Sequence, residues 1–236
     1  MRAVGRLHVL TPALEHPGGE RPRDSEEHAR ACLEIARSAL RGGADVLQLR
    51  EKSRSTREQI AIARALVALA RRSHAALIVN DRVDVAIAAD AHGVHLGGND
   101  FPVGLARRLL GPDRVIGASA QTVEMAREAA WAGADYLGVG DVFGTHSKPD
   151  AGPVVGIEGL RRIVQAVEIP VIAIGDVTAD RVADVIAAGA HGVAVIRAVC
   201  AAPDPEAAVK ELRERLQAAL ESTGRKGPHG DHRHSE

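Results

Sequence analysis

Polar residues able to bind phosphate follow a short apolar run early in this chain. The segment Leu47–Lys52 places Gln48, Arg50 and Lys52 at alternate positions. Because side chains alternate in direction along an extended segment, these three can face the same way. Two cations and an amide suit a phosphorylated or diphosphorylated ligand. An ordinary ion pair between Arg50 and Glu51 is the alternative interpretation of this segment.

Two carboxylates follow the next two apolar runs. Asn80 and Asp81 come directly after Ala76–Val79, and Asp100 comes shortly after Gly93–Leu96. Two carboxylates from neighbouring strand ends meet the needs of Mg²⁺, which keeps several waters and binds one or two carboxylates plus substrate phosphates. The alternative is that each aspartate caps the helix that follows it.

Hydroxyl groups and a further cation occur later in the chain. Thr145, Ser147 and Lys148 lie in a glycine-bearing loop, which indicates either an anion clasp or a polar surface loop. Ser119 is expected just beyond the end of a fifth strand. It has no adjacent His or Lys base in the sequence and no G-x-S-x-G turn, so we expect a hydrogen-bonding or proton-relay role.

These segments need a scaffold that brings the ends of many strands together. Strand-like runs alternate with helical patterns, which predicts βαβ units and a parallel sheet. The expected strands are Arg6–Thr11, Asp45–Leu49, Ala76–Val79, Gly93–Leu96, Arg114–Gly117, Tyr136–Val139, Val171–Ile174 and Gly192–Ile196. The expected helices are Glu26–Leu40, Thr56–Arg72, Asp84–Ala89, Val103–Leu109, Val123–Ala132, Ile157–Val167, Ala179–Ala187 and Pro205–Leu220.

The convergence of polar residues from nearly all strands favours closure over an open doubly wound sheet. We therefore expect an α/β fold, a TIM (β/α)8 barrel, whose active site lies on the rim at the carboxyl ends of the strands. In such barrels the loops after the last two strands commonly bind phosphate, here Gly175, Asp176, Ile196 and Arg197. Two phosphate sites on one rim indicate a reaction that joins two phosphorylated substrates.

Composition limits the other classes of function. The 236 residues are 45% hydrophobic, enough for a single barrel domain over residues 1–221, followed by a disordered His-rich tail over residues 222–236. The net charge of -1 argues against nucleic-acid and membrane partners, so we expect small-molecule partners. No apolar run approaches the roughly 18 to 20 residues that span a bilayer, and a cytoplasmic location is expected. Assembly into a homo-oligomer stays open.

Six motifs also match a known family in sequence order. They are Leu47–Lys52, Val79–Asp81, His95–Gly97 with Asp100, Gly117–Ala120, Thr145-x-Ser147-Lys148 and Ile172–Gly175. On these motifs the chain resembles the thiamine-phosphate synthases (thiamine-phosphate pyrophosphorylases). The resemblance implies a Mg²⁺-dependent transferase of thiamine biosynthesis with a TIM-barrel fold. Such an enzyme joins 4-amino-2-methyl-5-(diphosphooxymethyl)pyrimidine to thiazole phosphate or its carboxylate, with pyrophosphate leaving before the thiazole attacks.

The resemblance further implies roles for individual residues. The expected Mg²⁺ ligands are Asp81 and Asp100, and the expected catalytic residues are Ser119, Lys148 and Arg50. The expected substrate-binding residues are Gln48, Arg50, Glu51, Lys52, Asn80, Ser119, Thr145, Ser147, Lys148, Gly175, Asp176, Ile196 and Arg197.

Three positions depart from the family pattern. Gly98 replaces a Gln, Asp176 replaces a Gly, and Arg197 replaces a small polar residue. A carboxylate in a phosphate site would repel the ligand unless Asp176 points away or pairs with Arg197. Two alternatives follow: a TenI-like thiazole tautomerase and a non-catalytic ligand-binding barrel. The tautomerase lacks the metal-binding aspartates and has a His where this chain has Gln121, whereas Asp100 is present here.

Overall fold

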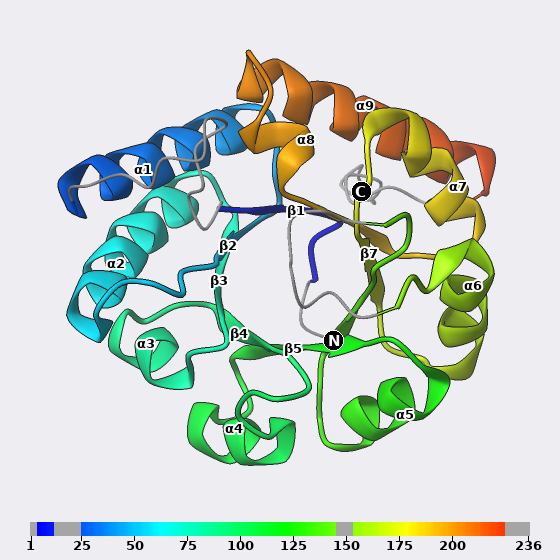
Figure 1. Cartoon of the computed structure of the whole chain (residues 1–236), viewed down its shortest axis with the longest axis horizontal. Helices are drawn as coiled ribbons and strands as arrows, with labels where there is room; N and C mark the ends of the chain where they lie inside the picture. Colours follow the sequence, from blue (N-terminus) through cyan, green and yellow to red (C-terminus); the bar gives the residue numbers. More distant parts are fainter. Residues whose placement is uncertain (1–3, 12–24, 145–152, 225–236) are drawn as a thin grey trace, which may run out of the picture.

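Eight parallel strands form a closed barrel in the computed structural model, which describes residues 4–11, 25–144 and 153–224 (Figure 1). Each strand pairs with the next one in sequence, and β8 pairs with β1. The strands are β1 (Leu7–Leu10), β2 (Val46–Leu49), β3 (Ala76–Asn80), β4 (Gly93–Leu96), β5 (Val115–Ala120), β6 (Tyr136–Val139), β7 (Val171–Ile174) and β8 (Gly192–Val195). The predicted TIM barrel is confirmed.

Helices surround the barrel and connect its strands (Figure 1). They are α1 (Ser25–Arg41), α2 (Thr56–Arg72), α3 (Val83–Ala88), α4 (Val103–Leu110), α5 (Val123–Trp131), α6 (Gly156–Ala166), α7 (Val182–Ala187), α8 (Arg197–Cys200) and α9 (Pro205–Ser222). A 3₁₀ turn, η1 (Ala179–Arg181), precedes α7, where the sequence predicts one continuous helix. The short helix α8 was not predicted.

Helix α2 illustrates why these segments form where they do. It begins with a capping box, in which the Ser55 hydroxyl accepts from the Glu58 N–H and the Glu58 carboxylate accepts from the Ser55 N–H. The side chains of Ile62, Leu66 and Ala70 recur at helical spacing and are buried against the sheet. The core therefore lies mainly between the strands and the helix ring.

A smaller group of side chains fills the inside of the barrel. Leu10, Tyr136, Ile172 and Ala194 pack together there. The ring of His8 contacts Tyr136 edge-on, with centroids 5.4 Å apart. Burial lowers the pKa of His8 to about 4, so this imidazole is neutral at pH 7. The barrel interior is thus packed, so a ligand site is expected at its carboxyl-end rim.

Strand β5 is longer than the sequence predicts, and most of the expected tail lies outside the described residues. The fifth strand was expected to end at Gly117, but β5 continues to Ala120, so Ser119 lies within the strand rather than beyond it. Of the expected tail, residues 225–236 lie outside the described part of the chain, and α9 extends to Ser222. No helix in the described ranges has the length and apolar character needed to cross a membrane.

Candidate functional site

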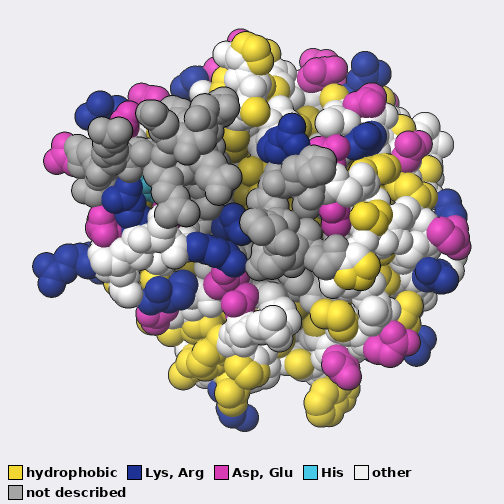
Figure 2. Space-filling view, in the orientation of Figure 1, with side chains coloured by type: hydrophobic (Ala, Val, Ile, Leu, Met, Phe, Trp, Pro, Cys, Tyr) yellow, Lys and Arg dark blue, Asp and Glu magenta, His cyan; other side chains and the backbone are white. Residues whose placement is uncertain are grey.

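A cavity of about 370 Å³ lies at the carboxyl ends of the strands. Acidic and basic side chains lie next to one another near the middle of this face in Figure 2. Most of the predicted site residues line this one cavity. They are Arg50, Lys52, Asn80, Asp81, Asp100, Ser119, Gly175, Asp176, Ile196 and Arg197. The rim is therefore the location where the predicted chemistry converges.

The segment after β2 contributes two cations to the cavity. The Arg50 backbone N–H donates to the Thr11 hydroxyl over 3.2 Å, and the Thr11 N–H donates to the Gln48 carbonyl over 2.9 Å. These bonds fix the chain where Arg50 leaves the strand. The Arg50 residue is 8% exposed, and no carboxylate of the described ranges forms an ion pair with its guanidinium. Such a cation is available to a ligand anion.

Two predicted substrate-binding residues of the same segment do not line the cavity. Gln48 is buried inside the barrel, where its amide lies close enough to the Tyr136 phenol to influence the pKa of that phenol. The Glu51 carboxylate points to the helix layer, where it lies 2.5 Å from His28. Alternation along the segment explains the difference, because Glu51 faces the opposite side from Arg50. The alternative interpretation of this segment, an Arg50–Glu51 ion pair, does not hold because Glu51 pairs with His28.

Asp81 follows β3 in a backbone conformation that is rare for residues other than glycine. Its φ is 65°, and its N–H donates to the His95 carbonyl of β4 over 2.8 Å. Strain of this kind is concentrated at functional sites. The carboxylate lies 3.7 Å from the Lys52 ammonium. Asp81 does not occupy the N-cap of α3, which is Arg82.

Asp100 enters the cavity from the loop after β4, the strand next to β3. One of its carboxylate oxygens accepts from the Gly97 N–H over 2.7 Å. The N-cap of α4 is Pro102, so Asp100 closes its own loop and does not cap that helix. Among the described residues, no three His, Cys, Asp or Glu side chains gather into a metal site. A cation held by Asp81 and Asp100 therefore needs ligand oxygens as well, as Mg²⁺ usually does.

Ser119 is the cavity end of a buried hydrogen-bonded chain. Its hydroxyl lies 3.0 Å from His95 Nε2, and His95 Nδ1 lies 3.0 Å from the Tyr136 hydroxyl. Burial raises the pKa of Tyr136, so this phenol keeps its hydrogen at pH 7 and can donate it.

One arrangement of hydrogens along the chain serves a ligand in the cavity. A Tyr136 hydroxyl that donates to His95 Nδ1 places the imidazole hydrogen on Nε2. Nε2 then donates to Ser119, and the serine hydrogen is left for the cavity. In a serine-hydrolase triad a carboxylate takes the place of Tyr136 and makes Nε2 a base. A neutral Tyr136 phenol lacks the charge of that carboxylate, so the chain is built as a hydrogen-bond relay to Ser119 and not as a triad.

Two glycines make room for the imidazole of His95. A Cβ on Gly138 would lie 2.8 Å from His95 Cε1, and a Cβ on Gly117 would lie 2.5 Å from His95 Nδ1. These distances are shorter than any ordinary carbon contact, so side chains at either position would displace the ring. The sequence Gly117-x-Ser119 therefore supplies the hydroxyl and also leaves space for the imidazole of His95.

The last two rim loops carry the two charged departures from the family pattern. Asp176, with a φ of 48°, pairs with Arg181 at 2.7 Å, and Arg181 also donates to the Asp176 carbonyl. Arg181 lies 4.9 Å above the Phe143 ring. The predicted partner of Asp176, Arg197, forms no ion pair within the described ranges and lines the cavity. Arg181 neutralises Asp176 and leaves Arg197 available to an anion.

Asp141, a charged residue of the cavity, was not predicted from the sequence. Asp141 follows β6 and is 5% exposed, and its carboxylate accepts from the Gly144 N–H over 3.0 Å. It packs so closely on Gly175 that a Cβ there would lie 2.0 Å from Asp141 Oδ1. The sequence signal was present, since Asp141 follows an apolar run as Asp81 does. The predicted residues Thr145, Ser147 and Lys148 lie outside the described ranges.

Comparison with known proteins gives a consistent result. The sequence model of a family described as "Thiamine monophosphate synthase" matches residues 23–199. A thiamine-phosphate synthase of Roseiflexus sp. (strain RS-1) is 52% identical over 198 residues, which is 84% of each chain. That of Moorella thermoacetica is 52% identical over 206 residues, or 87% of this chain and 92% of the relative.

Solved structures agree with these sequence matches. Thiamine phosphate pyrophosphorylase from Pyrococcus furiosus superimposes with a TM-score of 0.79 and 41% identity, covering 91% of this chain and 96% of the other. A 3-hexulose-6-phosphate synthase superimposes with a TM-score of 0.63 at 18% identity, which is a likeness of fold alone.

Proposed function

The chain belongs to the thiamine monophosphate synthase family, and we propose that its rim cavity forms thiamine phosphate with the help of Mg²⁺. The reaction joins a pyrimidine diphosphate to thiazole phosphate and releases pyrophosphate. The observation that carries the proposal is that two cations and two carboxylates, Arg50, Lys52, Asp81 and Asp100, line a single cavity. This is the set of groups that a diphosphate with a divalent cation requires.

Asp81 and Asp100 would hold the metal ion. Both are carboxylates on the loops of neighbouring strands, and oxygen is the ligand atom that Mg²⁺ prefers. When bound, Mg²⁺ would neutralise charge on the diphosphate and make it a better leaving group. The Lys52 ammonium, 3.7 Å from Asp81, adds a positive charge beside the same position.

The reaction needs little from the protein beyond charge and position. The bond between the pyrimidine methylene carbon and the diphosphate oxygen breaks, and its electron pair leaves with the oxygen. The lone pair of the thiazole nitrogen then forms the new carbon–nitrogen bond, with no proton transfer. Arg50 and Lys52 stabilise the departing charge, which is the effect expected to contribute most to the rate. A protein nucleophile is not required.

Ser119 would act as a hydrogen-bond donor to the pyrimidine substrate. With His95 Nε2 as the donor to the Ser119 oxygen, the Ser119 hydrogen is directed to a ligand acceptor in the cavity. The buried chain through Tyr136 holds that orientation in place. Ser119 touches the substrate in this proposal, whereas Tyr136 is a positioning residue that acts through it.

The Tyr136→Phe variant tests this orientation. We expect a loss of about 5- to 10-fold in kcat, since one net hydrogen bond of about 1 kcal/mol no longer fixes the imidazole. In a Ser119→Ala background the same substitution should add almost nothing, because Tyr136 acts only through the serine. Steady-state kinetics of the two single variants and the double variant measure this coupling. Equal losses from Tyr136→Phe in both backgrounds would show that its effect is structural.

Arg197 would bind the phosphate of the thiazole substrate. Arg197 is the first residue of α8 and lies beside the loops after β7 and β8. It lines the cavity, and no carboxylate of the described ranges pairs with it. For Arg197→Ala we expect the KM for thiazole phosphate to rise about 10- to 100-fold, the value of a charge-assisted hydrogen bond. The KM for the pyrimidine diphosphate should change little. A rise in the KM for the pyrimidine diphosphate with an unchanged KM for thiazole phosphate would show that Arg197 binds the pyrimidine substrate instead.

The proposed function is tested by mixing the two precursors with the protein, with and without Mg²⁺. Thiamine phosphate and pyrophosphate should form together, and only when the metal is present. Chelation should stop the reaction, and added Mg²⁺ should restore it. Isomerisation of the thiazole without coupling would instead indicate a tautomerase, and metal-independent coupling would remove the role given to Asp81 and Asp100.

A further inference from the structure

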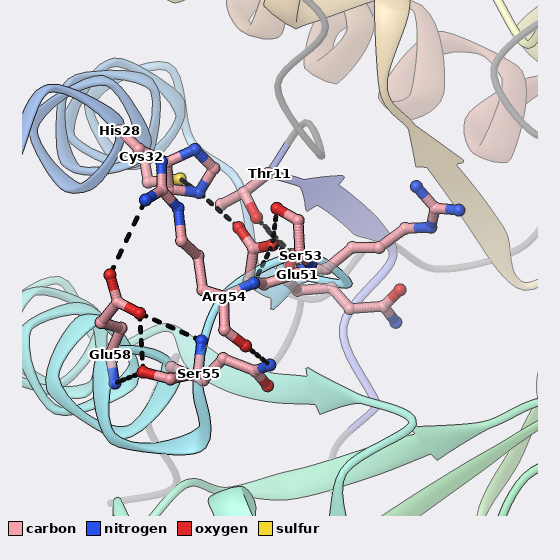
Figure 3. Close-up of polar contacts among 11 residues, drawn as sticks. Thr11, His28, Cys32, Glu51, Ser53, Arg54, Ser55 and Glu58 are labelled. Atoms are coloured by element: carbon pink, nitrogen blue, oxygen red, sulfur yellow. Dashed lines mark hydrogen bonds and ion pairs between the residues drawn. The ribbon is translucent and has the colours of Figure 1, made fainter. Parts of the chain in front are cut away.

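A buried ion pair lies behind the cavity, between the β2 segment and the first turns of α1 (Figure 3). His28 Nε2 lies 2.5 Å from Glu51 Oε2, and the two side chains are 4% and 1% exposed. Within the described ranges this buried oxygen accepts no well-aligned hydrogen bond, so its contact with His28 is one of distance and charge. A carboxylate oxygen at this distance favours a hydrogen on Nε2 of His28, because an ionised carboxylate has none to donate.

The other oxygen of Glu51 holds the turn that follows it. Oε1 accepts from the Ser53 N–H over 2.6 Å, from the Ser53 hydroxyl over 2.8 Å and from the Arg54 N–H over 3.2 Å (Figure 3). Burial acts to raise the pKa of Glu51, but the bonds from His28 and Ser53 outweigh it and hold the pKa at about 2. Glu51 is therefore charged throughout the physiological range.

Two further ionisable groups lie close to this pair. Burial raises the pKa of the Cys32 thiol, 3.6 Å from His28 Nε2, to about 12, so the thiol is neutral. The Arg54 guanidinium forms an ion pair with Glu58 over 3.7 Å, whereas His28 pairs with Glu51.

The position of Glu51 in the sequence connects this pair with the cavity. It stands between Arg50 and Lys52, and both of those cations line the cavity while Glu51 faces away from it. A carboxylate anchored at four points fixes the backbone between the two cations. Their separation and direction then depend on a helix that does not itself reach the ligand.

We propose that the His28–Glu51 pair positions Arg50 and Lys52 for the diphosphate of the pyrimidine substrate. The inference rests on the proposed function, since it concerns how that ligand is held. Glu51 and His28 are positioning residues and touch no substrate. Thus the structure gives Glu51 a role different from the substrate contact expected from its place in the motif.

The test uses three variants and two readouts. For His28→Ala and for Glu51→Gln, we expect the KM for the pyrimidine diphosphate and the Kd for inorganic pyrophosphate with Mg²⁺ to rise about 10- to 100-fold. The KM for thiazole phosphate should stay within about twofold of the unmodified protein, because Arg197 lies on another element. His28→Gln, which keeps an N–H donor, should recover part of the loss. It also serves as the test if His28→Ala does not fold.

The control is Arg41→Ala, which breaks an exposed pair between α1 and α9. Arg41 Nε lies 2.6 Å from Glu206, and Arg41→Ala should leave both KM values unchanged. Similar KM increases for both substrates, or a loss of active protein without any change in KM, would overturn the positioning role. If the unmodified protein binds Mg²⁺ and pyrophosphate but forms no thiamine phosphate, the proposed function fails instead, and the pyrophosphate Kd still tests the pair.

Discussion

Asp81→Asn and Asp100→Asn are each expected to reduce kcat/KM about 1,000-fold or more, because the site would lose charge stabilisation of the leaving diphosphate. Asparagine suits position 81, where φ is 65°, because it adopts the left-handed conformation more readily than most other residues. At position 100 its carbonyl can still accept from the Gly97 N–H. Steady-state kinetics with each substrate varied at saturating Mg²⁺ are the measurement.

The folded state of these variants should be preserved. Two rim carboxylates repel each other when no cation is bound, so removing one charge should cost less than about 1 kcal/mol of unfolding free energy. Asp90→Asn is the matched control. Asp90 also has a positive φ, of 54°, but follows α3 at the opposite end of the barrel, where it pairs with Arg71 and Arg114. Near-normal turnover by both rim variants would refute the metal assignment.

The second large effect is expected from Arg50. Arg50→Ala should lower kcat/KM about 100-fold or more, because a largely buried cation that lines the cavity would be lost at the leaving group. Arg50→Lys should recover only part of this loss, since an ammonium has the charge but lacks the planar fork of donors. Kinetics with varied pyrimidine diphosphate measure both variants.

Arg54→Ala is the control for Arg50. Arg54 belongs to the same segment, but its guanidinium lies near Glu58 and does not line the cavity. Its backbone N–H still donates to Glu51 after the substitution, so the turn is kept. An Arg54→Ala variant as impaired as Arg50→Ala would mean that the segment contributes general charge rather than a specific contact.

Most of the barrel could be predicted from the sequence because its elements are strongly patterned. The strands β4, β6 and β7 and the helix α2 have the predicted bounds. In a parallel barrel each strand is a buried apolar run bounded by turn residues. Alternation of such runs with helices therefore predicts both where the strands lie and that they are parallel. The extension of β5 was missed because Ser119 and its small neighbours are not typical of a strand interior.

The site was predicted as far as strand ends determine it. Asp81, Asp100, Arg50 and Lys52 share one cavity because parallel strands end at one rim. Partners that come from distant elements could not be predicted. His28 lies on α1, and nothing in its local pattern indicates that it faces Glu51. Likewise, the choice of Arg181 over Arg197 as the partner of Asp176 depends on the 3₁₀ turn before α7.

The central claim is that Asp81 and Asp100 bind one cation together with a diphosphate. A crystal structure with pyrophosphate and Mn²⁺, which accepts the same oxygen ligands as Mg²⁺ and scatters anomalously, tests it most directly. We predict one anomalous peak coordinated by both carboxylates and by the diphosphate, with the diphosphate in contact with Arg50 and Lys52. A peak that contacts neither aspartate, or a diphosphate bound away from this rim, would contradict the account.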